Sequence, residues 1–148
     1  TMIDRSKLEN VILVADRGYE NYNIFAHAIE KGWKFAIRVK DKNSNGIASG
    51  LNLPPNDEFD IDITQIFSRK NTKTTKNADY KWMPVNQVFD YLPRKSDKTY
   101  ELSFEMAHYA DIGIILHREK YIRATRSTSS FDLISLLVAS IIGCSVMP

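Results

Sequence analysis

The sequence predicts an α/β fold in which a strand–helix–strand unit is followed by an inserted antiparallel β subdomain. Two observations predict it. An apolar run, a helical pattern and a second strand pattern follow one another within residues 11–39, and short β segments separated by turn clusters follow from residue 40. A strand, a helix and a strand in this order predict two parallel strands joined by a right-handed crossover. The length of 148 residues is enough for one domain with its own core.

Residues 11–15 form the first predicted strand. They are a continuous apolar run, Val-Ile-Leu-Val-Ala, rich in β-branched side chains. Such a run is typical of a strand at the centre of a sheet, covered on both faces. Asp16 follows the run and is therefore expected at the carboxyl end of a central strand, where open α/β sheets bind ligands. The alternative is that Asp16 only caps the next helix, a position in which aspartate is common.

A helix is predicted between the two strands because apolar residues recur there with helical spacing. His27 falls outside the apolar face and is expected at the surface. Gly32 stands where a helix C-cap is expected, and residues 33–39 alternate as a second strand. The residues of the apolar face are Tyr22, Phe25, Ala26 and Ile29.

The segment after residue 41 has the pattern of a β-rich subdomain. Clusters of Asn, Ser, Gly and Pro predict turns, and the stretches between them have strand-like composition. Phe59, Ile61 and Ile63 would share one face of a strand, because side chains alternate between the faces. The predicted β segments are residues 46–53, 59–63 and 79–83, and residues 112–116 form a further candidate strand.

Composition excludes several classes of protein. The net charge is only +2, so any case for nucleic-acid binding depends on where the charges lie. The single cysteine, Cys144, cannot form an internal disulfide, which favours a reducing cytoplasm and excludes a thiolate metal site. The N-terminus does not have the pattern of a signal peptide. Residues 133–147 are too short and too interrupted to span a membrane.

The most specific pattern is an ordered set of motifs. An apolar strand ends in Asp16-Arg-Gly-Tyr, a helix follows, and the next strand ends at Arg38 and Lys40. This order is similar to the second-aspartate region of insertion-sequence DDE transposases, in the group with a downstream Tyr-Arg-Glu-Lys signature. A lone Asp-Arg-Gly-Tyr would be weak, but the ordered set is specific. Matching residues continue at 46–47, 51–54, 59–60, 68–73, 89–93 and 100–104.

The resemblance implies a partial ribonuclease H-like fold and metal-dependent DNA cleavage and strand transfer at transposon ends. It assigns residues 1–41 to the ribonuclease H-like unit, 42–104 to the inserted subdomain and 105–148 to an unmatched C-terminal tail. Members use two divalent ions, Mg²⁺ or Mn²⁺, held mainly by carboxylates. Asp16 is by this resemblance the second metal-binding catalytic carboxylate. The implied setting is the bacterial cytoplasm at the nucleoid, with DNA as partner, no membrane, and a homodimer as an open alternative.

Two departures from the family pattern predict a fragment that is inactive alone. The first catalytic aspartate of the family lies on an earlier strand, and this sequence starts too late to include it. The pattern Y-x2-R-x3-E-x6-K, which supplies the catalytic glutamate, has no match between Tyr100 and Tyr121. Two alternatives stay open: a non-catalytic DNA-binding remnant of a mobile element, and a remnant without any activity.

Basic residues supply the candidate DNA contacts. Four cations within residues 69–76 suit sequence-independent contacts to phosphate. Three further basic residues lie at the ends of the two predicted strands. The alternative in every case is a solvated surface charge, which is the usual role of such residues. The candidates are Arg17, Arg38, Lys40, Arg69, Lys70, Lys73 and Lys76.

Overall fold

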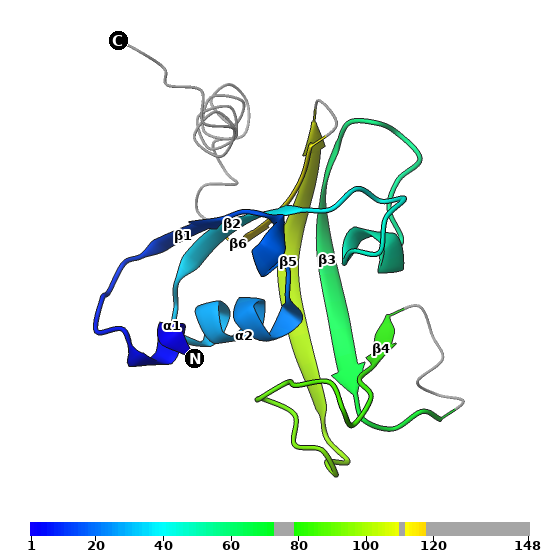
Figure 1. Cartoon of the computed structure of the whole chain (residues 1–148). Coiled ribbons are helices and arrows are strands. Elements are labelled where there is room, and N and C mark those ends of the chain that lie inside the picture. Colours follow the sequence, from blue (N-terminus) through cyan, green and yellow to red (C-terminus); the bar gives the residue numbers. More distant parts are fainter. Residues whose placement is uncertain (73–78, 110–111, 118–148) are drawn as a thin grey trace.

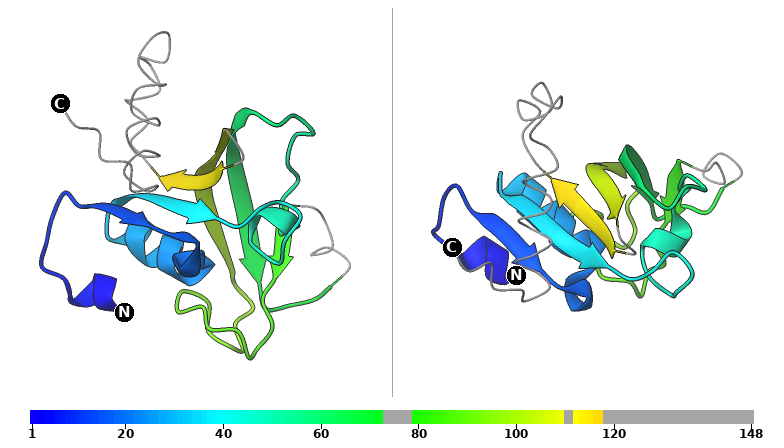
Figure 2. Two further views of the ribbon diagram at one scale, coloured as in Figure 1. Left: turned by 45° about the horizontal axis from the view of Figure 1, so that its top comes forward. Right: turned by 90° about the horizontal axis from the view of Figure 1, so that it is seen from above.

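The computed structural model describes residues 1–72, 79–109 and 112–117. Within these ranges a six-stranded sheet has the order β1-β2-β6-β5-β3-β4, and helix α2 packs against it (Figures 1 and 2). The strands are β1 (Ile12–Ala15), β2 (Lys34–Val39), β3 (Phe59–Ser68), β4 (Tyr80–Trp82), β5 (Thr99–Tyr109) and β6 (Ile112–His117). The helices are α1 (Met2–Arg5) and α2 (Tyr22–Glu30), with 3-10 turns η1 (Arg17–Tyr19) and η2 (Ala48–Gly50).

The predicted strand–helix–strand unit is confirmed. Strands β1 and β2 pair in parallel, with Leu13 opposite Phe35, and α2 connects them. The side chain of Asn21 caps the start of α2 by accepting a hydrogen bond from the backbone N–H of Asn23. Gly32 follows the helix with φ +71°, a left-handed conformation that glycine adopts without strain.

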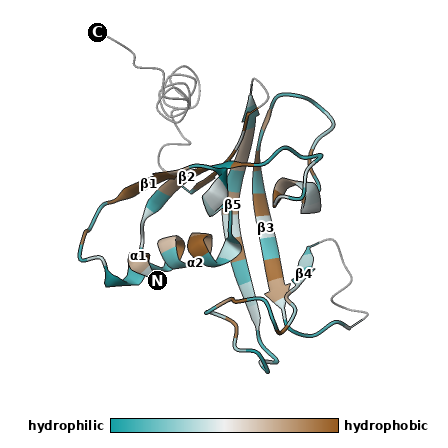
Figure 3. Ribbon diagram, viewed as in Figure 1, coloured by the Kyte–Doolittle hydropathy of each residue, from teal (hydrophilic) through white to brown (hydrophobic). Residues whose placement is uncertain are grey.

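Strand β1 is not central, contrary to the expectation from its apolar run. It is at the edge of the described sheet, and its side chains alternate between exposed and half-buried. Ile12 is 62% exposed and Val14 is 42% exposed, whereas Leu13 and Ala15 pack against the core. Figure 3 shows the apolar colour of this strand at the border of the sheet. The run is apolar throughout, but in the described residues only one of its faces is covered.

The strands after residue 41 belong to the same sheet as the strand–helix–strand unit. Strands β3 and β5 form a long antiparallel pair, whereas the short β4 is parallel to β3. Strand β6 lies between β2 and β5 and is antiparallel to both. The boundary predicted between residues 104 and 105 falls within β5.

The strand expected at residues 46–53 is absent from the described structure, and that prediction was wrong. This segment contains the 3-10 turn η2 instead. The turn is held by a hydrogen bond from the Ser49 hydroxyl to the Gly46 carbonyl, at 2.7 Å. Local hydrogen bonds of serine compete in this way with pairing in a sheet.

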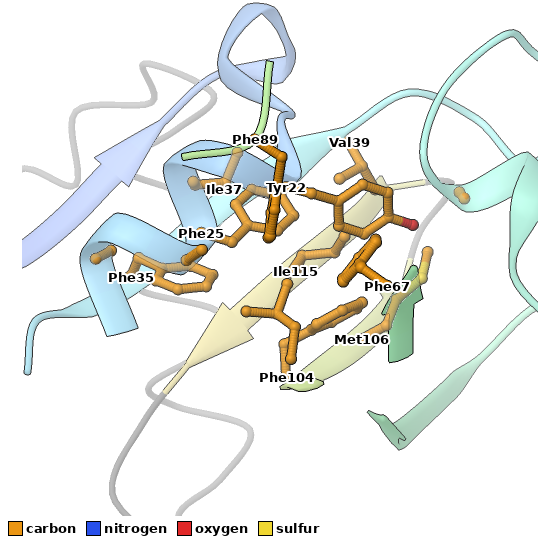
Figure 4. Close-up of a cluster of buried hydrophobic side chains, with 14 of the residues drawn as sticks. Tyr22, Phe25, Phe35, Ile37, Val39, Phe67, Phe89, Phe104, Met106 and Ile115 are labelled. Atoms are coloured by element: carbon orange, nitrogen blue, oxygen red, sulfur yellow. The ribbon is translucent and has the colours of Figure 1, made fainter. Parts of the chain in front are cut away.

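The main core forms between α2 and one face of the sheet. Phe25 of α2 is fully buried and stacks on Phe35 of β2, with ring centroids 5.3 Å apart. Tyr22 lies one helical turn earlier and contacts Phe67 of β3 and Phe104 of β5 (Figure 4). Through these aromatic contacts, α2 packs against β2 of the strand–helix–strand unit and against β3 and β5, which come later in the chain.

His27 is buried, contrary to the expectation that it lies at the surface. It is 6% exposed, because α1 and the segment after β4 cover the side of α2 that lies outside its apolar face. Its Nδ1 is 2.8 Å from Asp4 Oδ1, and its Nε2 is 2.7 Å from Asp90 Oδ2. The Tyr91 hydroxyl is 3.0 Å from His27 Nδ1. We call these four side chains the histidine cluster.

In the ranges that the structure describes, no helix is both long enough and apolar enough to cross a membrane.

Candidate functional site: a cationic cleft beside Asp16

Asp16 stands at the carboxyl end of β1, as its place in the sequence predicts, and its side chain is exposed. Its Oδ1 accepts a hydrogen bond from the backbone N–H of Arg17 at 2.8 Å, so the residue caps the 3-10 turn η1. The alternative raised by the sequence was capping of the next helix; Asp16 caps the turn η1, whereas Asn21 caps α2. The carboxylate is still accessible to solvent, and capping by one oxygen is compatible with binding a ligand.

A cleft with a volume of about 350 Å³ lies next to this turn. Arg17 enters it from η1, Lys40 from the end of β2, and Lys81 from β4. Glu20, just before α2, and Tyr22, its first residue, also line the cleft. Three cations and one carboxylate give this set a net positive charge, and they come from three parts of the chain: residues 17–22, Lys40 and Lys81.

Glu20 connects the turn before α2 to the end of β2. Its side chain is 7% exposed, its Oε2 accepts a hydrogen bond from the backbone N–H of Lys40 at 2.6 Å, and its Oε1 is 4.0 Å from Lys40 Nζ. A Cβ atom added at Gly46 would lie 2.6 Å from Glu20 Oε1 and 2.8 Å from Lys40 Cβ. Position 46 therefore needs glycine, because any side chain there would disturb this connection.

Lys81 is a residue of the cleft that the sequence did not reveal. It lies in the short strand β4, and its Nζ is 5.5 Å from the centroid of the Tyr22 ring, within range of a cation–π interaction. Burial lowers the pKa of Lys81, because the charged ammonium loses solvation. No local pattern marks this lysine, since only the pairing of β4 with β3 brings it to the start of α2.

The other basic candidates do not gather at this cleft. Arg38 lies in β2 next to Val39 and Ile37, which face α2, so alternation directs Arg38 to the opposite face of the sheet. Lys70 forms an exposed ion pair with Asp97, with Nζ and Oδ1 2.8 Å apart. The candidates Lys73 and Lys76 lie outside the described residues.

Arg69 is directed to the protein's own backbone. Its Nη1 donates to the carbonyls of Pro84 at 2.6 Å and Gln87 at 3.0 Å, and its Nε and Nη2 donate to the carbonyl of Leu92 at 3.1 and 2.9 Å. A guanidinium group can serve several carbonyls at once because it carries five N–H donors in a fixed plane. These bonds organise the segment after β4, and they direct the guanidinium group of Arg69 to the protein's own backbone.

The described residues do not fit a complete divalent-metal site. Among residues 1–72, 79–109 and 112–117, no group of three or more His, Cys, Asp or Glu side chains is placed to hold a metal ion. Magnesium in enzymes is usually held by one or two carboxylates with substrate phosphates and waters, and Asp16 is an exposed carboxylate of the chemical type that such a site uses.

Comparison with known proteins identifies the family. The family model described as "Transposase DDE domain" matches residues 1–118. The match therefore extends past the last motif, at residues 100–104, through the rest of β5 and all of β6. Neither a curated protein nor a solved structure matches the chain. Members of this family generally use divalent metal and act on DNA. Since the match covers most of the 148 residues, the chain belongs to the DDE transposase domain family.

Proposed function

We propose that this chain is the second-aspartate segment of a DDE transposase catalytic domain, from the group with the Tyr-Arg-Glu-Lys signature, and that it binds the DNA backbone. The observation that carries the proposal is the exposed Asp16 carboxylate at a strand end, beside a cleft with Arg17, Lys40 and Lys81. A metal-binding carboxylate next to cations suits a phosphodiester substrate. The complete domain would cleave and transfer DNA strands with Mg²⁺ or Mn²⁺.

The edge position of β1 in the described sheet supports a ribonuclease H-like arrangement. Ile12 and Val14 are exposed on one face of this strand, and β1 is at the border of the described sheet. We infer that a further parallel strand pairs with β1 and brings the first catalytic carboxylate close to Asp16. Unpaired edges of apolar strands readily accept another strand, so this arrangement would also bury the exposed side chains.

DNA binding is tested by the salt dependence of affinity for a nonspecific duplex. The affinity of the 148-residue chain should fall steeply with salt, because each neutralised phosphate releases a counterion. Substituting Lys40→Met should lower the slope of log affinity against log salt by about one unit. Arg69→Lys is the control with unchanged charge: it should disturb the segment after β4 but leave the slope unaltered. A chain that does not bind the duplex at low salt contradicts the proposal.

A second candidate function is DNA binding without catalysis. It is favoured by the lack of a three-residue metal cluster among the described residues. The two candidates differ in nicking of supercoiled DNA with Mn²⁺. Nicking that is lost in Asp16→Ala would support a catalytic role, whereas DNA binding without nicking, unchanged in Asp16→Ala, would support the second candidate.

A further inference from the structure

We propose that the cleft at the start of α2 is a binding site for one phosphate group, in which the Tyr22 hydroxyl and Lys81 hold the phosphate oxygens and Arg17 and Lys40 add positive charge. The inference deepens the proposed function, on which it rests for the source of the phosphate, namely the DNA backbone. It assigns ligand-binding roles to two residues outside the Asp-Arg-Gly-Tyr motif and the basic segment 69–76.

The hydroxyl of Tyr22 is the first observation. Tyr22 is 5% exposed and lines the cleft, and its hydroxyl is buried without a hydrogen-bond partner among the described residues. Buried hydroxyls without partners are rare in folded proteins, because desolvation is not offset. Figure 4 shows this oxygen directed away from the aromatic cluster that surrounds the ring. A phosphate oxygen in the cleft would accept the hydrogen bond for which the described residues supply no acceptor.

The charge of the cleft is the second observation. Arg17, Lys40 and Lys81 line it together with one carboxylate, Glu20. Glu20 is already engaged by the backbone N–H of Lys40, so its charge is partly offset within the protein. An anion would also favour the charged form of Lys81 and reverse the effect of burial on its pKa.

The backbone adds to this field. Helix α2 has nine residues, and its capping residue Asn21 lies in the lining of the cleft. The start of a helix carries partial positive charge and unsatisfied N–H groups, which favour anions. Residues 17–22, which include the helix start and the Tyr22 hydroxyl, thus meet Lys40 and Lys81 at one cleft.

The test is to titrate the 148-residue chain with inorganic phosphate and to measure the binding by calorimetry. Tyr22→Phe keeps the packed ring and removes only the hydroxyl, and Lys81→Met removes the ammonium. Each should weaken phosphate binding roughly tenfold, the typical effect of losing a hydrogen bond to a charged group. Lys95→Met, at an exposed lysine outside the cleft, is the matched control and should bind phosphate as the parent chain does.

Glu20→Gln gives a change of opposite sign. It keeps an acceptor for the Lys40 N–H and removes the negative charge, so phosphate should bind more tightly. If the parent chain does not bind phosphate, or if Tyr22→Phe binds it as well as the parent, the site is refuted. Should Lys81→Met fail to fold, Tyr22→Phe and Glu20→Gln decide the question.

Duplex DNA distinguishes this inference from the proposed function. If DNA is the source of the phosphate, Lys81→Met should lower the salt slope by about one unit. Phosphate binding that depends on Tyr22, in a chain that does not bind DNA, would support the site and contradict the proposed function. The opposite result would refute the site and leave the proposed function standing. In that case Lys81→Met binds DNA with the salt slope of the parent chain, and Tyr22→Phe and Lys81→Met bind phosphate as tightly as the parent does.

Discussion

Helix α2 carries two buried polar side chains whose surroundings are opposite. His27 is 6% exposed and Tyr22 is 5% exposed. Both ring nitrogens of His27 contact carboxylates within 2.8 Å, whereas the Tyr22 hydroxyl has no partner among the described residues. Equal burial therefore has two outcomes: the polar atoms of the histidine cluster bond to one another, whereas the Tyr22 hydroxyl bonds to none of the described residues.

The difference comes from what covers each end of the helix. Asp4 of α1 and Asp90 after β4 reach His27 from two sides. Asn23 reinforces this contact, since its Nδ2 donates to Asp90 Oδ2 at 2.9 Å and its Oδ1 accepts from the Asp90 N–H at 2.9 Å. At the start of the helix, the residues around Tyr22 form an open cleft instead. The contrast can be tested by substitution.

His27→Ala should have the largest effect on stability. It removes two hydrogen bonds to carboxylates and leaves a cavity beside α1, so we expect a loss of roughly 3 kcal/mol in the free energy of unfolding. Urea denaturation measures it. Lys95→Ala, at an exposed position, should change stability by less than about 0.5 kcal/mol. A His27→Ala chain as stable as the parent would mean that the histidine cluster does not hold the segments together.

Asp90→Asn should change the stability of the chain in acid. Hydrogen bonds from Asn23 and His27 lower the pKa of Asp90. A carboxylate with a lowered pKa stabilises the fold above its unfolded pKa, about 3.9, and this contribution is lost as the pH falls through the lower folded value. The parent chain should therefore lose stability below about pH 4 more steeply than Asp90→Asn.

The matched control for this acid effect is Asp97→Asn, the same chemical change in the exposed pair with Lys70. Thermal unfolding between pH 2 and 6 should show the parent slope for Asp97→Asn, because exposed ion pairs contribute little. Equal slopes in the parent and Asp90→Asn would show that His27 and Asn23 do not stabilise the Asp90 carboxylate.

Tyr22→Phe and Tyr91→Phe should give the smallest effects, with opposite signs. Both remove one hydroxyl and keep the ring. Tyr91 loses its contact with His27 Nδ1, so Tyr91→Phe should destabilise the chain by about 1 kcal/mol. Tyr22→Phe removes a buried hydroxyl that has no partner in the described part of the chain, and stability should be unchanged or rise by up to about 1 kcal/mol. Destabilisation by Tyr22→Phe would show that its hydroxyl is bonded within the protein.

The strand–helix–strand unit and the position of Asp16 after a strand could be predicted from sequence because their signals are local, whereas the edge position of that strand could not. The apolar run before Asp16, the helical spacing from Tyr22 and the glycine at position 32 each act within a few residues. The family resemblance had the same basis, since its most specific part is contained in residues 12–41.

Tertiary structure alone decided which polar groups are saturated and which stay open. Periodicity directed His27 outward, but packing of α1 and the segment around Asp90 buried it. A cluster of basic residues suggested that Arg69 contacts DNA, but nearby carbonyls bind its guanidinium group. Lys81 reaches the cleft only because β4 pairs with β3. In each case the deciding partner is distant in the sequence, and hydrogen bonding of buried groups is determined by the partners that folding brings together.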